Sequence, residues 1–303
     1  MRVQFCDAMV AQAHQRAQLV FLTGDLGFMA LEPLQAAMGS RFINAGVAEQ
    51  NMVSVAAGLA HQGMEPWVYS IAPFCYARPF EQIRNDVTFH NLPVRLVGNG
   101  GGYGYGVMGP THHAIEDYGV LLCLPNMSAL VPVFDEDISA VVDRATGIPH
   151  AVYLRLGRGE KPKGYLPPVY APWRQLVDGD GPAFIAVGPL AGSYIEAFWQ
   201  LSAASRPALW AISELPLQAH PLPPALLDRI VSRGEVFVAE EHVSRGSFGS
   251  ELALRLVRNG VGLRKFVHLF AQAHHFERYG SQQFLRRQSG LDPGSALEAL
   301  AAS

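Results

Sequence analysis

The sequence has little charge and no long apolar run, and each shortage excludes a class of protein. Only 16% of its 303 residues are charged, against ~25% in an average soluble domain, and the net charge is −3. Proteins that bind nucleic acid usually carry a basic stripe, so we expect no nucleic-acid partner. No apolar run approaches the ~18 residues of a membrane helix, and the N-terminal stretch has no continuous apolar core of a signal peptide. We therefore expect neither a membrane span nor a leader.

Cysteines and several familiar catalytic motifs are also scarce. The three cysteines, Cys6, Cys75 and Cys123, are odd in number and form no CxxC pair. Such a set is typical of free thiols in a reducing compartment, so a cytoplasmic location is expected. The sequence contains no GxSxG elbow, no Walker motif and no HExxH motif. Their absence argues against the hydrolases, nucleotide triphosphatases and zinc proteases that depend on them.

Short apolar runs alternate with longer amphipathic stretches along most of the chain. This alternation predicts an α/β fold built from right-handed βαβ units around mostly parallel sheets. The expected strands are 19–23, 42–44, 67–69, 94–97, 129–133, 151–156, 183–187, 208–212, 236–239 and 266–270.

A stretch rich in glycine and proline separates the two halves of this pattern. Glycine and proline interleave from Gly157 to Pro182. Proline removes a backbone donor and glycine loosens the chain, so no long element is expected there. The sequence therefore predicts a first domain over residues 1–160, a linker over 161–182 and a second domain over 183–303.

Glu49 lies in the first turn of a predicted helix that follows a strand and a turn at Gly46. A carboxylate in this place can simply complement the helix dipole, which stabilises a helix by ~0.3–1 kcal/mol. The alternative is functional, because ligands of open α/β sheets bind where strand ends lead into helices. A carboxylate removed from water there can share a proton with a ligand nitrogen. Spacing alone leaves both interpretations open.

Two loops that follow strands contain further candidates. The loop over residues 69–80 is rich in aromatic rings, which in such loops belong to a core or interface more often than to a cofactor site. The glycine-rich segment over residues 98–113 contains a G-x-G-x-x-G match that is weak without a following helix. It ends on His112 and His113, which are adjacent and point ~100° apart on a helix. Adjacent histidines rarely bind one metal, so no metal site is expected.

Three motifs taken together resemble the C-terminal half of transketolase. They are Phe42-Ile-Asn-Ala-Gly-Val-Ala-Glu-Gln, Phe80-Glu-Gln-Ile-Arg-Asn-Asp and Gly109-Pro-Thr-His-His-Ala-Ile-Glu-Asp, supported by Leu124-Pro-Asn-Met and Glu240-Glu-His. The resemblance covers nearly the whole chain and is to the free-standing C-terminal subunits of split transketolases. It implies two three-layer α/β/α domains, each with a mostly parallel sheet. The first would be the pyrimidine-binding domain and the second the transketolase C-terminal domain.

The resemblance also implies an activity and a partner. In the family, a further domain with a GDG…N metal loop anchors thiamine diphosphate, and this chain has no such loop. A separate N-terminal subunit would therefore carry that domain and bind most of the Mg²⁺, in an α2β2 heterotetramer. The implied reaction belongs to carbohydrate metabolism. It transfers a two-carbon ketol unit from a ketose donor to an aldehyde acceptor with thiamine diphosphate as cofactor.

Four residues match cofactor-binding positions of the family. Glu49 matches the catalytic carboxylate that hydrogen-bonds N1′ of the aminopyrimidine ring. Phe74 is the first candidate for the aromatic ring that stacks on the pyrimidine, and Tyr76 is the second. Asp25 matches an acidic position near the cofactor whose role is more structural.

The substrate side of the resemblance is less complete. His112 looks like the active-site histidine near the reacting oxygens, and Arg155 is expected to retain a cationic position. Gly100 stands where a phosphate-binding histidine is usual, Met108 where an aspartate reads a hydroxyl, and Met29 where a phosphate-binding serine is usual. These departures make the pocket more apolar and favour a non-standard, less phosphorylated substrate.

Several alternatives stay open at this point. The β subunits of 2-oxo acid dehydrogenases share the layout but differ around the glutamate. Deoxyxylulose-phosphate synthase shares the Ala-Glu-Gln and Thr-His motifs but carries its first domain on the same chain. A non-catalytic assembly subunit has no reason to keep a desolvated Glu49. A dinucleotide oxidoreductase is the most distant alternative and rests on the G-x-G-x-x-G match alone.

Overall fold

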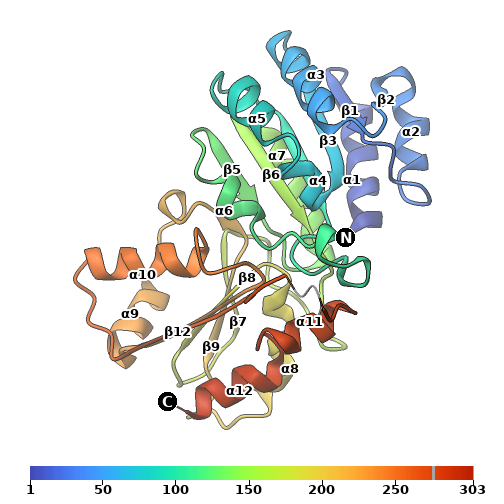
Figure 1. Cartoon of the computed structure of the whole chain (residues 1–303). Helices are drawn as coiled ribbons and strands as arrows, with labels where there is room; N and C mark the ends of the chain where they lie inside the picture. The colour runs from blue at the N-terminus through green and yellow to red at the C-terminus, as the bar shows by residue number, and fades with distance from the viewer. Residues whose placement is uncertain (275–276, 303) are drawn as a thin grey trace.

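The computed structural model describes residues 1–274 and 277–302 and contains two β-sheets flanked by helices (Figure 1). The first half of the chain forms α1 (Arg2–Gln15), β1 (Leu19–Thr23), α2 (Glu32–Met38), β2 (Phe42–Asn44), α3 (Glu49–His61), β3 (Glu65–Ile71), α4 (Ala72–Tyr76), α5 (Phe80–Gln82), β4 (Arg95–Asn99), α6 (Asp117–Leu121), β5 (Met127–Leu130), α7 (Ile138–Gly147) and β6 (Ala151–Leu156). The second half forms β7 (Trp173–Val177), β8 (Ala183–Val187), α8 (Leu190–Trp199), β9 (Ala208–Ile212), β10 (Glu214–Leu215), α9 (Pro224–Arg233), β11 (Glu235–Glu240), α10 (Phe248–Arg258), β12 (Lys265–Phe270), α11 (Gln282–Gln288) and α12 (Pro293–Ala301).

Both sheets are mostly parallel, which confirms the predicted fold class. The first sheet has the order β10-β5-β6-β4-β3-β1-β2, and only β10 runs antiparallel to its neighbour. The second sheet has the order β12-β11-β8-β9-β7, and only β7 is antiparallel. β6, β8 and β9 are buried along their whole length, as expected of parallel strands that helices cover on both faces.

Helices cover both faces of each sheet. Along β1, Phe21 packs with α1 and α7, whereas Val20 and Leu22 point to the other face and pack with α3. This alternation follows from the two-residue period of a strand. In the second sheet, α9 and α10 lie on one face and α8 and α12 on the other (Figure 1). The two three-layer α/β/α units expected from the sequence are therefore present.

Two strands have no counterpart among those expected from the sequence. The segment up to Pro182, in which no long element is expected, contains the five-residue strand β7, which pairs with β9 at the edge of the second sheet. Edge pairing needs only a short stretch between prolines. β10, from the second half, pairs with β5 and so extends the first sheet. The domain limits at residues 160 and 182 stay predictions.

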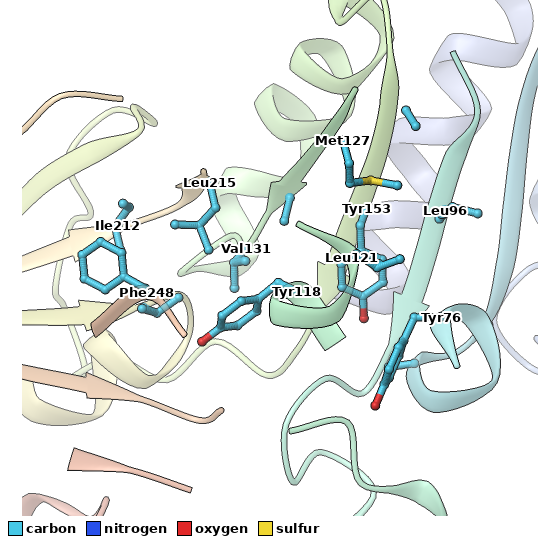
Figure 2. Packing of buried hydrophobic residues seen from close by; sticks show 14 of the residues in the cluster. Tyr76, Leu96, Tyr118, Leu121, Met127, Val131, Tyr153, Ile212, Leu215 and Phe248 are labelled. Atoms are coloured by element: carbon cyan, nitrogen blue, oxygen red, sulfur yellow. The ribbon is translucent and has the colours of Figure 1, made fainter. Parts of the chain in front are cut away.

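The core is continuous across the two halves of the chain. Tyr118 on α6 lies between Phe248 and Ile212 of the second half and Tyr153 of the first half (Figure 2). Its ring stacks on His242 with centroids 4.1 Å apart. Because one apolar cluster joins both sheets, the halves pack as a unit, and polar groups at their junction must find partners inside the protein.

Glu240 is a fully enclosed carboxylate at this junction. It ends β11 with no exposed surface. Its Oε2 accepts hydrogen bonds from the Tyr118 hydroxyl and from the Phe248 amide at 3.1 Å. Its Oε1 accepts from the Gly249 amide at 2.8 Å and lies 2.7 Å from His268 Nε2. Glu240 thus connects β12, α6 and the start of α10 through hydrogen bonds.

This network predicts a pH-dependent contribution to stability. Burial alone raises the pKa of Glu240, but the hydrogen bond from His268 and the charge of His242 hold that pKa below its ordinary value of 4.5. A carboxyl with a lower pKa in the folded state stabilises above its unfolded pKa and loses that effect as pH falls through the folded value. We expect Glu240→Gln to lower the free energy of unfolding by about 2–3 kcal/mol at pH 7. Denaturation of both proteins at pH 7 and at pH values below 4.5 measures the difference, which should shrink in acid; a constant difference would contradict this role of Glu240.

Candidate active site

Glu49 is a buried carboxylate at the carboxyl edge of the first sheet. Gly46, with φ +72°, turns the chain after β2, so that α3 begins at Glu49. The side chain is 4% exposed and lies beside the ends of two other strands. A side chain added at Gly24, after β1, would meet Glu49 Cγ at 3.6 Å, and the Ser70 hydroxyl of β3 donates to Oε1 at 3.4 Å. Three strand ends therefore enclose this carboxylate.

An arginine that the sequence motifs did not single out is the main partner of Glu49. Arg78 Nη1 donates to both oxygens of Glu49 at 3.0 Å. The same guanidinium lies over the Phe74 ring, with its Cζ 3.9 Å from the ring centroid. Arg78 stands in the aromatic loop already noted, two residues after Tyr76, but nothing in its spacing indicated that it would fold back onto Glu49.

Phe74 and His112 lie side by side next to this pair. Their ring centroids are 5.1 Å apart at an interplanar angle of 69°. Phe74 is half-buried on the short helix α4, and His112 is half-buried in a 3₁₀ turn. The Nδ1 atom of His112 lies 2.9 Å from the Thr111 hydroxyl. The structure thus brings three of the predicted residues, Glu49, Phe74 and His112, into one cluster with Arg78.

Tyr76 is placed differently from Phe74. Its ring is buried in the core, and its hydroxyl donates to Glu116 Oε2 at 3.2 Å. Burial and the charges of Asp117 and Glu116 raise the pKa of this hydroxyl, so the phenol stays protonated. Of the two rings predicted to stack on a cofactor, Phe74 is the one that the structure leaves partly open.

Asp25 acts on Glu49 through the backbone. It lies in the exposed loop after β1, in a left-handed conformation with φ +58°. Its Oδ1 accepts a hydrogen bond from Asn44 Nδ2 at 2.8 Å, and Asn44 Oδ1 accepts from the Gly46 amide at 3.0 Å. This chain of two bonds stabilises the turn that leads into Glu49, and the role expected of Asp25 near a cofactor stays a prediction.

Arg155 lies inside the junction of the two halves. It is 3% exposed, and its Nε donates to Asp117 Oδ2 at 2.7 Å. Its Nη2 donates to the carbonyl oxygens of Ala114 at 2.8 Å and Glu241 at 2.9 Å. These bonds fasten β6 to α6 and to the end of β11. The substrate role expected of Arg155 stays a prediction, and its burial does not favour it.

A second arginine, three residues further on, lies in an open cleft. The cleft has a volume of about 610 Å³ and runs along the carboxyl ends of β4 and β6. Its lining includes Arg158, Arg2, Gly100 and Tyr105. Arg158 is exposed and forms no ion pair with any residue in the described part of the chain. The Tyr105 ring lies 6.4 Å from the His112 ring, so the cleft leads toward the Glu49 cluster.

The glycine-rich segment does not form a dinucleotide site. After Gly104 the chain makes 3₁₀ turns at Gly106–Met108 and Pro110–His112 instead of opening an α-helix. The fingerprint requires such a helix, because its N-terminus binds the pyrophosphate. Residues 1–274 and 277–302 contain no group of three or more metal-ligating side chains. Within the same ranges, no helix is long and apolar enough to cross a bilayer.

The sequence is similar to known transketolases and to a related synthase. Residues 1–163 match the family described as transketolase, pyrimidine binding domain. One subunit of the apulose-4-phosphate transketolase from Phocaeicola vulgatus is 29% identical over 270 residues, which cover 87% of this chain and 85% of the relative. The 1-deoxy-D-xylulose-5-phosphate synthase of Thermus thermophilus is 29% identical over 98% of this chain, but the chain spans only 47% of its length.

Solved structures show the same relation. A structure described as a split gene transketolase, inactive beta4 tetramer, superposes with a TM-score of 0.82 at 28% identity and covers 99% of this chain and 96% of its own. The transketolase of Leishmania mexicana shares the fold, with a TM-score of 0.79 at 18% identity, and the chain spans 45% of it. The chain is thus homologous to one of the subunits of split transketolases. Because the matched segment exceeds half of the chain, the protein belongs to the family of the transketolase pyrimidine-binding domain.

Proposed function

We propose that this chain is the C-terminal subunit of a thiamine diphosphate-dependent enzyme that transfers a two-carbon ketol unit from a ketose to an aldehyde. The observation that carries the proposal is Glu49, a carboxylate 4% exposed beside Phe74 and His112, in a chain of the transketolase family. When bound, thiamine diphosphate supplies the carbon nucleophile that carries the two-carbon unit.

The residues around Glu49 fit the aminopyrimidine half of this cofactor. The Arg78 guanidinium is flat, lies on Phe74 and donates to both oxygens of Glu49. A flat group with nitrogen donors is therefore accommodated between the ring and the carboxylate. We propose that the partner subunit binds the metal and the diphosphate.

Glu49 is suited to hold or return a proton at a ring nitrogen. It lies out of water, where a hydrogen bond to a ligand is stronger than in solvent. Phe74 would fix the plane of the ring, and the Asp25–Asn44–Gly46 chain would fix the direction of α3. His112, packed on Phe74, is placed to contact the oxygens of a substrate that reaches the ring.

Exposed apolar side chains support the need for a second polypeptide. Phe28 and Met29 follow β1 and are 84% and 82% exposed. Val47, just before α3, and Val107 and Met108, in the glycine-rich segment, are also exposed. All of them lie in segments that follow the carboxyl ends of strands of the first sheet. Exposed apolar groups along one edge favour burial against a partner. We propose the N-terminal transketolase subunit as that partner, in an α2β2 assembly.

The cleft suggests how an anionic substrate is held. Arg158 offers a guanidinium there that has no ion pair to a described residue, and Gly100 brings no polar side chain. The related Phocaeicola vulgatus enzyme is named for a phosphorylated sugar, apulose 4-phosphate. In place of the less phosphorylated substrate expected from the sequence, we propose that this chain takes a phosphorylated sugar of non-standard shape, with Arg158 rather than Arg155 contacting the phosphate.

Replacing Arg158 tests the substrate class. We expect Arg158→Ala to raise KM for a phosphorylated ketose by at least about tenfold, because one charge-assisted bond is worth roughly 1.5–3 kcal/mol. The melting temperature should stay unchanged, since Arg158 is exposed. Steady-state kinetics with the phosphorylated sugar and its unphosphorylated form measure the effect. An equal change for both sugars would contradict phosphate binding at this residue.

Reconstitution tests the proposed function itself. The chain is purified with an N-terminal transketolase subunit, thiamine diphosphate and Mg²⁺, and ketol transfer between sugars is assayed. We expect activity only from the mixture of both subunits. If the complex instead decarboxylates a 2-oxo acid, or if the partner is equally active alone, the proposed reaction is wrong. The second outcome would assign this chain to the non-catalytic assembly subunits.

A further inference from the structure

Arg78 is the one member of the Glu49 cluster that the proposed reaction does not require. Its side chain is 46% exposed, whereas Glu49 beneath it is 4% exposed. The arginine therefore reaches from the surface inward to a buried acid. Its two contacts are the two that an aminopyrimidine ring would need, namely the face of Phe74 and the oxygens of Glu49.

The same space cannot hold the guanidinium and a stacked ring. Cζ of Arg78 is 3.9 Å from the centroid of Phe74, which is the separation of two flat groups in contact. Nη1 of Arg78 is 3.0 Å from both Oε1 and Oε2 of Glu49, so it fills the position from which a ligand nitrogen would approach. A ring that stacks on this face of Phe74 and bonds Glu49 must displace Arg78.

The burial of Glu49 explains why the unassembled chain benefits from a guanidinium in the place of the cofactor ring. An ionised carboxylate out of water is costly unless it is paired and hydrogen-bonded. Within the described residues, the other side-chain donor to Glu49 is the Ser70 hydroxyl, at a longer 3.4 Å. Arg78 supplies the opposite charge, and because its side chain is 46% exposed it has room to move outward.

We propose that Arg78 is an internal occupant of the pyrimidine site. In the free subunit its guanidinium satisfies Glu49 and covers Phe74, and the cofactor ring competes with it for both. This inference rests on the proposed function. It makes Arg78 a residue that sets the affinity and the timing of cofactor binding, because the ring enters only when other contacts, above all those of the partner subunit, offset the loss of the ion pair.

Binding of the isolated pyrimidine half tests the competition directly in the full-length chain. The probe is the hydroxymethyl aminopyrimidine that forms one half of thiamine, titrated by NMR against the wild type and Arg78→Ala. We expect the dissociation constant to fall by about fivefold in Arg78→Ala, which corresponds to about 1 kcal/mol. Arg78→Lys keeps the charge but not the flat surface. Its dissociation constant for the probe should lie between those of the wild type and Arg78→Ala. Arg84→Ala, an exposed arginine of the following segment with no ion pair to a described residue, is the matched control.

A second readout needs no ligand. Without its partner Glu49 is left buried and unpaired, so Arg78→Ala should lower the melting temperature of the free chain more than Arg84→Ala does.

In the assembled complex, Arg78→Ala should bind thiamine diphosphate at least as tightly as the wild type. Weaker binding of probe or cofactor by Arg78→Ala would overturn the inference and make Arg78 a supporting residue, while leaving the proposed function intact. If the wild-type complex bound no thiamine diphosphate at all, both the inference about Arg78 and the proposed function would be wrong.

Discussion

Replacing Glu49 by glutamine is expected to lower ketol transfer by about 10²–10⁴-fold in the reconstituted complex. Glutamine keeps the shape of the side chain but cannot take or return a proton. The fold should tolerate the change, because Arg78, the partner that loses its ion pair, is 46% exposed and can be solvated by water. The affinity for thiamine diphosphate should fall much less than the rate of ketol transfer.

Deuterium exchange separates the role of Glu49 in proton transfer from a general loss of binding. The exchange of the C2 proton of bound thiamine diphosphate is followed by NMR after acid quench, in wild type and Glu49→Gln. Glu251→Gln is the matched control, because Glu251 also lies in the first turn of a helix but away from the site. We expect slow exchange in Glu49→Gln alone. Normal exchange in that variant would show that Glu49 merely complements the dipole of α3.

Replacing Arg155 by methionine should cause the largest loss of stability. Asp117, its partner, has no exposed surface, and removing one member of a buried pair costs about 3–5 kcal/mol. The Tyr153 hydroxyl also donates to Asp117 Oδ2, at 2.8 Å, but it brings no charge. The carbonyl oxygens of Ala114 and Glu241 would each lose one donor as well. We expect Arg155→Met to unfold at a markedly lower denaturant concentration than the wild type.

A double variant distinguishes this structural role from substrate binding. Arg155→Met combined with Asp117→Asn removes the orphaned charge, so part of the lost stability should return. Arg158→Ala, three residues away and exposed, should show the opposite pattern, with normal stability and a raised KM. If Arg155→Met were fully stable and raised KM instead, the substrate role expected from the sequence would be correct and the structural role would be wrong.

The sequence predicts the strands well where burial dictates composition. The runs of β1, β6, β8 and β9 are buried throughout, and their limits are found where expected. β7 and β10 could not be predicted, because an edge strand is defined by its pairing partner and not by its own pattern.

The same limit applies to the candidate site. Glu49, Phe74 and His112 follow from motifs, and the structure brings them together. The pairing of Arg78 with Glu49 joins positions 29 residues apart, and no spacing rule encodes it. Arg155 was expected at the substrate because the resemblance to transketolases implies a cationic position there. Position along the sequence does not reveal that Asp117 and two carbonyl oxygens surround it.

Calorimetric titration of thiamine diphosphate, in Mg²⁺ buffer, tests most directly whether two polypeptides share the cofactor site. The cofactor is added to this chain alone, to the N-terminal subunit alone and to their mixture. We expect tight, stoichiometric binding only in the mixture, because under the proposed function the diphosphate site lies on the N-terminal subunit and the buried acid on this chain. Equally tight binding of the whole cofactor to this chain alone, or a mixture whose binding is unaffected by Glu49→Gln, would contradict the shared site.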